Sequence, residues 1–231
     1  MTISGPPVLG FVLVAFFVAF TVWCLLGVRK RRQEMAAAAQ RIGFNFLGET
    51  WQGLVLNPRF KTWLLQSGHA RADNVMVGVS GSFEVTVFDY TYTTQDNSDQ
   101  FRSISQTIAC FSHTVELPPF TLEAENVLTR IGNAILHNDI DFESHPAFSR
   151  RYALKSPDEA GTRRLFTPAV LTEMEQISSE APWNIETSGI NLFLYRAGRV
   201  VSPSSLATFL QETSAIATVI FNSEGLKNPV A

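Results

Sequence analysis

Cysteine and charge are both scarce in this chain of 231 residues. Two cysteines are too few for the disulfide framework on which small secreted domains depend. Charged residues make up only 17% of the sequence, against about 25% in ordinary globular proteins, so an apolar segment must dilute the composition. The 18 phenylalanines and 4 tryptophans exclude a disordered, coiled-coil or collagen-like chain. A globular protein attached to a membrane remains.

The apolar residues gather near the N-terminus. Residues Val8 to Val28 form a run without a charge, which as a helix is about 31 Å long and matches a hydrocarbon core of about 30 Å. A cleaved signal peptide needs a basic segment before the apolar run and small residues before the cut. Here residues 1–7 have no lysine or arginine, and bulky Trp23 precedes Cys24. The run therefore predicts a transmembrane helix over 8–28 rather than a signal peptide or a lipoprotein leader.

Four basic residues follow this run directly: Arg29, Lys30, Arg31 and Arg32. Basic residues beside a span mark its cytoplasmic side, so we expect residues 1–7 outside the cell membrane and the soluble part in the cytoplasm. Apart from these four, 14 basic residues oppose 21 acidic ones, which leaves the rest of the chain with a net charge of −7. An acidic domain is a poor binder of nucleic acid. The expected contacts are the lipid bilayer and a protein partner at the cytoplasmic membrane face.

Beyond the span, the pattern predicts an α+β domain with a mainly antiparallel sheet and short helices. Residues 29–43 should continue the membrane helix as a basic stalk that ends at Gly43. The domain occupies 44–225 and divides by pattern into a β-rich part (44–122) and an α+β part (123–225). In the β-rich part we expect strands at 75–79, 83–92 and 105–113, with a turn at Ser80-Gly81-Ser82. The second strand places Phe83, Val85 and Val87 on one face and Phe88, Tyr90 and Tyr92 on the other.

The second half of the domain predicts several short helices and a hairpin. Helical spacing covers 125–136, and Ser156 should cap a helix that ends before Thr167-Pro168, where a second helix begins. Ser188-Gly189 should join two strands, 183–186 and 191–196. The last helix should run from Pro203 to Phe221 and bury one apolar stripe: Leu206, Phe209, Leu210, Ile216 and Ile220.

One stretch has the side chains of a metal site. In HNDIDFESH, imidazoles and carboxylates occupy every second position: His137, Asp139, Asp141, Glu143 and His145. Such groups suit zinc or another transition metal. Alternate residues of an extended strand stand about 6.6 Å apart, however, too far to surround one ion. Pro146 offers a bend only after the run, so we expect a solvated strand face and no metal centre.

Other chemistry is sparse. No P-loop, G-x-G-x-x-G, H-E-x-x-H or C-x-x-C motif occurs, so we assign no cofactor and no catalytic residue. Cys110 lies in an apolar strand and is expected to pack in a core. Asp89, between Phe88 and Tyr90, is expected to accept hydrogen bonds.

Part of the second half resembles a known family. The matching residues are Phe148-Ser149-Arg150-Arg151-Tyr152-Ala153-Leu154, Ser156 to Glu159 and Arg163-Arg164-Leu165-Phe166-Thr167-Pro168, with Phe88-Asp89-Tyr90 and the hairpin at Asn184–Arg196. The pattern is similar to that of a bacterial family of membrane-anchored proteins with a domain of unknown function. The resemblance covers about residues 70–200. It implies an aromatic-rich strand that leads into an acidic helix start, and it implies no activity.

Two functions follow from these observations. The first is a membrane-anchored cytoplasmic module that binds a protein or a small ligand at the membrane face. The alternative is a metal-assisted hydrolase that uses the His137–His145 segment. Convergence of those side chains in a deep pocket would favour the enzyme, whereas scattered and outward-pointing side chains would favour the binding module.

Overall fold

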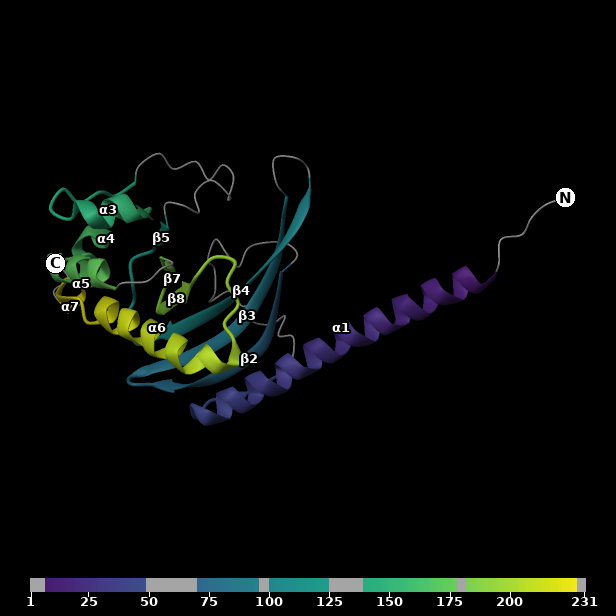
Figure 1. Cartoon of the computed structure of the whole chain (residues 1–231). Coiled ribbons are helices and arrows are strands. Elements are labelled where there is room, and N and C mark those ends of the chain that lie inside the picture. The colour runs from purple at the N-terminus through teal and green to yellow at the C-terminus, as the bar shows by residue number, and fades with distance from the viewer. Residues whose placement is uncertain (1–6, 49–69, 96–99, 125–138, 178–181, 228–231) are drawn as a thin grey trace.

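The structure, a computed structural model, describes residues 7–48, 70–95, 100–124, 139–177 and 182–227 (Figure 1). A long first helix, α1 (Pro7–Arg41), precedes a domain of strands and shorter helices. The strands are β1 (Asn45–Phe46), β2 (Ala70–Ser80), β3 (Phe83–Gln95), β4 (Phe101–Ser112), β5 (Thr121–Ala124), β6 (Tyr152–Lys155), β7 (Asn184–Ser188) and β8 (Asn191–Tyr195). The remaining helices are α3 (Pro146–Arg151), α4 (Glu159–Leu165), α5 (Pro168–Gln176), the 3₁₀ helix η3 (Pro203–Ser205), α6 (Leu206–Phe221) and α7 (Glu224–Lys227).

The two ends of the first helix have different surroundings. Its part from Val12 to Trp23 is exposed along its whole length and extends away from the domain (Figure 1). By length and composition the helix, over its stretch Val12–Arg41, is able to cross a membrane. Its last turns instead bury Met35, Ala38 and Ala39 in the domain core. The helix ends before Gly43, whose φ of +76° is easily adopted only without a side chain. The predicted stalk is therefore a continuous extension of the apolar helix.

The domain is built on one antiparallel sheet of eight strands in the order β1-β2-β3-β4-β8-β7-β5-β6. This confirms the predicted α+β class with antiparallel pairing. The predicted hairpin turn lies at Gly81, with φ of +62°, between β2 and β3. The pairing of β4 with β8 joins strands from both stretches that the sequence pattern separates at residue 122.

The helices gather on one face of this sheet. The larger core contains residues of α1, α3, α4, α5 and α6 together with the strand residues Phe83, Val85 and Val87. A second cluster lies on the opposite face and consists of strand residues, among them Phe88, Tyr90 and Tyr92. The predicted division of β3 into two faces is therefore confirmed. Asp89 lies two and four positions from Val87 and Val85 along the strand, so its side chain points to the same face, on which the helices lie.

Two helix starts differ in how well the sequence predicts them. Thr167 caps α5 as expected, since its side chain accepts from the amide of Val170. Ser156 does not cap α4: Asp158 does, through a hydrogen bond from Gly161 N to Asp158 Oδ1 of 2.9 Å. The hydroxyl of Ser156 donates instead to the carbonyl of Pro119. Ser156 Oγ also accepts from the amide of Asp158 at 2.9 Å. The capping prediction is wrong because α4 begins only at Glu159, which gives the cap position to Asp158.

The last helix agrees with its prediction except at one position. Leu206, Phe209, Ile216 and Ile220 are buried, whereas Leu210 only packs partly against the core. The hairpin β7–β8 turns at Gly189, as expected. The strand that the family resemblance implies from Phe148 begins only at Tyr152, because residues 146–151 form α3. The helix predicted over 125–136 lies outside the described residues.

Candidate functional site

A buried carboxylate in the middle of β3 connects the sheet to α1. Asp89 is 7% exposed, and Arg31 Nη2 lies 2.8 Å from its Oδ2. Asn74 Nδ2 donates to the same oxygen at 2.8 Å, and Thr107 Oγ1 donates to Oδ1 at 2.6 Å. The carboxylate thus accepts hydrogen bonds, as predicted. We call this group of four residues the clamp.

The clamp extends into the loop before α6. Arg31 Nη2 also donates to the carbonyl oxygen of Val201 at 3.0 Å. The amide of Val201 donates in turn to Thr107 Oγ1 at 2.9 Å. Asn74 reaches Asp89 from an irregularity in β2, where its own φ is +50°. One guanidinium therefore holds α1 to a strand and to a loop at the same time.

Sequence reasoning treats the four basic residues as equivalent, and the structure distinguishes them. Arg29, Lys30 and Arg32 are exposed, and Lys30 pairs with Glu34 at 3.8 Å. Arg31 lies four and seven positions before Met35 and Ala38. Arg32 lies three and seven positions before Met35 and Ala39, so both arginines are in line with the buried stripe of the stalk. That alignment is a signal that narrows the four to two, and the packing of the domain selects Arg31.

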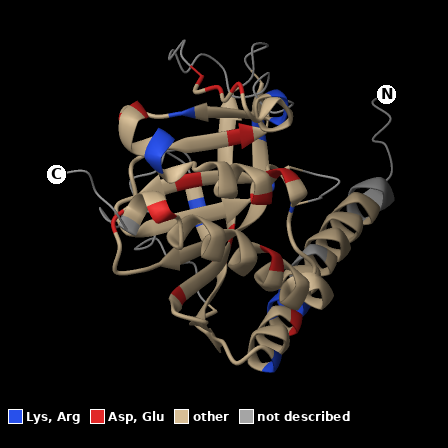
Figure 2. Cartoon of the chain, turned by 90° about the vertical axis from the view of Figure 1, so that its left-hand side faces the viewer, with Lys and Arg blue, Asp and Glu red and all other residues tan. Residues whose placement is uncertain are grey.

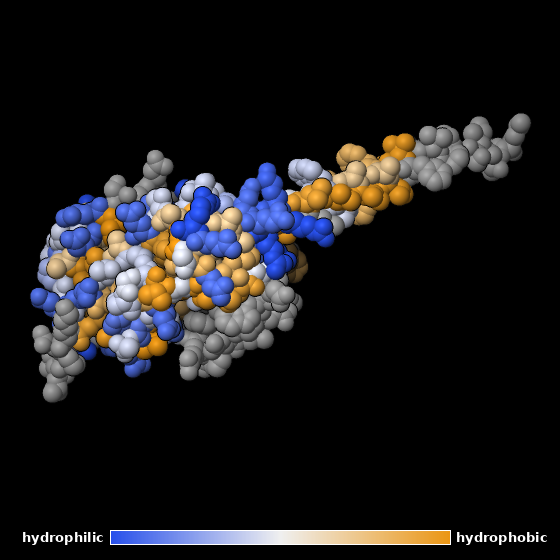
Figure 3. Space-filling model, turned by 90° about the horizontal axis from the view of Figure 1, so that it is seen from below, coloured by the Kyte–Doolittle hydropathy of each residue, from blue (hydrophilic) through white to orange (hydrophobic). Residues whose placement is uncertain are grey.

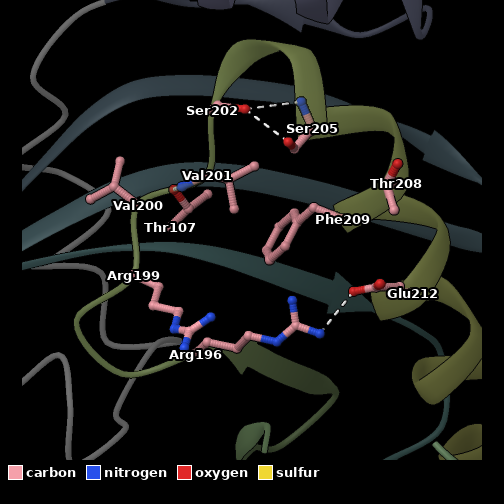
Figure 4. Close-up of a pocket in the computed structure, with 10 residues that line it drawn as sticks. All are labelled: Thr107, Arg196, Arg199, Val200, Val201, Ser202, Ser205, Thr208, Phe209 and Glu212. Carbon is pink, nitrogen blue, oxygen red and sulfur yellow. Dashed lines mark hydrogen bonds and ion pairs between the residues drawn. The ribbon is translucent and has the colours of Figure 1, made fainter. Parts of the chain in front are cut away.

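A pocket opens beside the clamp, between the β8–α6 loop and α6 (Figure 4). Its volume is about 340 Å³. Thr107 belongs to the clamp and also lines the pocket. The lining residues come from β4, the loop and the start of α6: Thr107, Arg196, Arg199, Val200, Val201, Ser202, Ser205, Thr208, Phe209 and Glu212.

The floor of the pocket carries two arginines with different surroundings. Arg196 Nη2 pairs with Glu212 Oε2 at 2.9 Å, and its guanidinium lies 3.9 Å from the ring centre of Trp183. Arg199 is exposed, and among the described residues no ion pair or side-chain hydrogen bond holds its guanidinium. Figure 4 shows both guanidinium groups at the same end of the pocket. One positive charge therefore remains after the pairing of Arg196 with Glu212.

Hydroxyl groups and apolar side chains form the rest of the pocket. Ser202 Oγ accepts from the amide of Ser205 and caps η3. Thr208 is exposed on the first turn of α6. Val200 is 41% exposed at the mouth, and buried Phe209 lies inside. Apart from Thr107, the lining residues lie within the one segment 196–212, and no short motif in that segment predicts a pocket.

The candidate metal residues do not converge in the described part of the chain. Asp139, Asp141 and Glu143 are exposed, and Ile140 between them is buried. A turn at Glu143–Ser144 bends the run before Pro146, contrary to the expectation. It leaves His145 Nε2 3.3 Å from Thr172 Oγ1. His137 lies outside the described residues, and among those described no three metal-ligating side chains gather. No described contact favours the hydrolase, and the absence of a metal centre stays a prediction.

Two other buried groups on the second face of the sheet have shifted pKa values. Burial raises the pKa of the Cys110 thiol to about 12, which makes this thiol a poor nucleophile. Burial, and then the nearby charge of Glu186, raise the pKa of Tyr195 well above its usual value. Tyr195 donates to Glu186 Oε1 at 2.6 Å. Both groups stay protonated at neutral pH and act as packing and hydrogen-bonding groups.

Comparison with known proteins gives a fold and no family. No family model matches the chain, and no curated protein matches it. A solved structure does match: the crystal structure of the mycobacterial trehalose monomycolate transport factor A, TtfA, with a TM-score of 0.55 and 13% sequence identity. The match covers 83% of this chain and 97% of that chain. At this identity the similarity shows a shared fold.

Proposed function

We propose that this chain is a single-pass membrane protein whose domain is fixed against the cytoplasmic face of the membrane and binds a partner there without catalysing a reaction. The observation that carries the proposal is the clamp. Arg31 lies three residues beyond the last apolar residue of the span, Val28, and it is hydrogen-bonded to both Asp89 and Val201. The domain is thereby held directly at the end of the span.

The packing of the stalk makes this connection stiff. Buried Met35, Ala38 and Ala39 prevent the last turns of α1 from rotating away from the sheet. A flexible tether would leave the domain free to tumble below the membrane, whereas this arrangement gives the domain one orientation. Figure 3 shows a hydrophilic band where the apolar part of α1 meets the domain, as expected for a headgroup boundary. A fixed orientation is useful to a protein that presents one surface to a membrane-embedded partner.

The charge distribution supports the same orientation. Basic residues gather on α1 where it meets the domain, while acidic residues are spread over the domain itself (Figure 2). An anionic leaflet attracts the first group and repels the second. The basic stalk should therefore lie at the membrane surface, and the acidic domain should extend from it into the cytoplasm.

The structural neighbour suggests the kind of assembly. TtfA is described as a transport factor for trehalose monomycolate. By analogy with that name, we propose that this chain acts as an accessory component of a membrane transport assembly, with no cargo specified. The resemblance to a bacterial family of membrane-anchored proteins, also part of the proposal, is compatible with this role.

Site-specific photo-crosslinking in native membranes tests the proposal. A photoreactive amino acid at Ala207, exposed in the first turn of α6 beside α1, should give a discrete crosslinked protein. The same group at Gln176, exposed at the end of α5 on the far side of the domain (Figure 1), should not. The crosslink should be lost in Arg31→Ala and kept in Arg29→Ala. Equal crosslinking from positions 207 and 176, or crosslinking at 207 that is unchanged in Arg31→Ala, would contradict the proposal.

A further inference from the structure

We infer that the pocket beside the clamp binds the phosphorylated headgroup of an anionic phospholipid from the adjoining leaflet. This inference rests on the proposed function, because it uses the position of the domain at the membrane face. The membrane provides the ligand. The position of the pocket relative to the bilayer, its charge and its shape all suit that ligand. Each of these three properties follows from described contacts.

The position of the pocket relative to the bilayer follows from the clamp. Arg31 lies three residues beyond Val28, about 4.5 Å along the helix axis. Its guanidinium donates to the carbonyl of Val201, a residue that lines the pocket. The headgroup region of a bilayer extends about 5–8 Å beyond each side of the hydrocarbon core. The wall of the pocket at Val201 is therefore held within the headgroup layer.

The charge of the pocket suits a phosphate group. Glu212 neutralises Arg196, and the Arg199 guanidinium has no charged partner among the described residues. A guanidinium binds phosphate through paired hydrogen bonds, which are stronger than hydrogen bonds between neutral groups. This positive site stands out because the chain beyond the juxtamembrane cluster is acidic. The nearby basic residues of α1 would further concentrate anionic lipid around it.

The shape of the pocket suits the rest of a lipid headgroup. The hydroxyls of Ser202, Ser205 and Thr208 lie along one side (Figure 4). Ser202 and Ser205 are hydrogen-bonded to each other at 2.8 Å, so Thr208 and one hydroxyl of the serine cluster would donate to phosphate or glycerol oxygens. Val200 and Phe209 give an apolar wall for the glycerol carbons. The one positive charge that remains, on Arg199, matches a headgroup with one negative charge, such as phosphatidylglycerol.

Native mass spectrometry of the full chain tests the inference. The protein is extracted in mild detergent from vesicles of equal phosphatidylglycerol and phosphatidylcholine, and the retained lipids are counted. We expect one phosphatidylglycerol per chain, with its affinity reduced by about tenfold or more in Arg199→Gln through the loss of charge-assisted hydrogen bonds. The control Arg29→Gln removes an exposed charge outside the pocket and should retain the lipid. Equal retention by Arg199→Gln and wild type would overturn the inference.

Two further arms separate the sources of the phosphate and the two proposals. Inorganic phosphate at millimolar concentration should leave the lipid bound, and displacement by it would reassign the pocket to free phosphate compounds. Unchanged thermal unfolding of Arg199→Gln shows that loss of lipid is not loss of fold. Retention of lipid without the crosslink at Ala207 would refute the proposed function and keep the pocket assignment. A crosslink at Ala207 without retained lipid would refute the pocket assignment and keep the proposed function.

Discussion

Asp89 is a carboxylate among the buried side chains of β3, and its burial determines what its neighbours must do. A buried charge without a partner costs several kcal/mol, so the donors Arg31, Asn74 and Thr107 are required for the strand to be stable. The sequence predicts that Asp89 accepts hydrogen bonds but does not predict from where. Arg31 is separated from it by 58 positions, and only the tertiary packing of α1 brings the two together.

The clamp predicts an order of destabilisation. Arg31→Ala leaves the buried Asp89 carboxylate without a charged partner and should lower the free energy of unfolding by about 3–5 kcal/mol. Asp89→Ala removes the buried charge itself and leaves Arg31 bonded to Val201 O and partly exposed, so the loss should be smaller, about 1–3 kcal/mol. Arg29→Ala removes an exposed charge and should change the free energy by less than about 0.5 kcal/mol. Chemical unfolding of the full chain in detergent measures all three, and equal effects of Arg31→Ala and Arg29→Ala would contradict the clamp.

Cys110 predicts a dependence of stability on alkaline pH. Its pKa is about 12 in the folded chain against 9.0 for an unperturbed thiol, so between these values the unfolded chain releases a proton that the folded chain keeps. Stability from this group is complete below pH 9.0 and is lost as the pH rises toward about 12. Cys110→Ala should therefore lose less stability than wild type as the pH rises from 9.0 toward about 12, and the slopes of the free energy of unfolding against pH should differ by up to about one proton. Parallel curves for the two proteins would refute the shift.

Phe209 on α6 predicts a packing cost. It is 4% exposed and its ring centre lies 5.8 Å from that of buried Trp183. Phe209→Ala should lower the free energy of unfolding by about 3–5 kcal/mol, since it leaves a cavity in the main core. The exposed neighbour Thr208 is the matched control, and Thr208→Ala should change little. A thermal melt of the full chain that is the same for both variants would reject the burial.

At the scale of elements, the junction of α1 with the sheet depends on a glycine. A side chain at Gly78 of β2 would meet the ring of Phe44, with Cγ at 2.6 Å and Cε1 at 2.7 Å. Phe44 is buried and follows directly after the end of α1. The ring therefore fits only because residue 78 has no Cβ atom.

Gly78→Ala should loosen the attachment of the stalk. The displaced ring should cost about 1–3 kcal/mol, the usual cost of overpacking. Hydrogen exchange of the full chain should show faster exchange in residues 38–46 than in wild type. The control is Val79→Ala, at the next position of the strand, where the side chain is 69% exposed. Unchanged exchange in Gly78→Ala would show that the ring has room to move.

Elements that depend on local patterns are the ones the sequence predicts. The division of β3 into two faces and the cap at Thr167 need only alternation and local hydrogen bonding, and both are confirmed. The cap at Ser156 fails because the helix begins only at Glu159, two residues later than the pattern indicates. All but one of the residues that line the pocket lie within 196–212, but the hollow depends on how this segment packs over Thr107 of β4, which no local pattern states.

At the scale of the whole molecule, the apolar helix and the domain form a single unit with a defined direction. The span ends at Val28, the four basic residues follow, and the clamp begins among them. Translocation of basic residues across a membrane is disfavoured, so the end of the span that carries the clamp should remain on the cytoplasmic side. With the topology that we propose, the pocket would be turned to the inner leaflet.

This direction predicts the outcome of cysteine labelling in intact cells. Cys24 and Cys110 are first replaced by Ala, and single cysteines are placed at Ser4 or at Thr114, which is exposed between β4 and β5. A membrane-impermeant maleimide should label the cysteine at position 4 directly and the one at position 114 only after permeabilisation. Replacing the four basic residues by Gln should allow part of the chain to insert in reverse, because the bias that orients the span is then lost. Labelling of position 114 in intact cells with the basic residues present would overturn the topology, and the headgroup site would then have to face the outer leaflet.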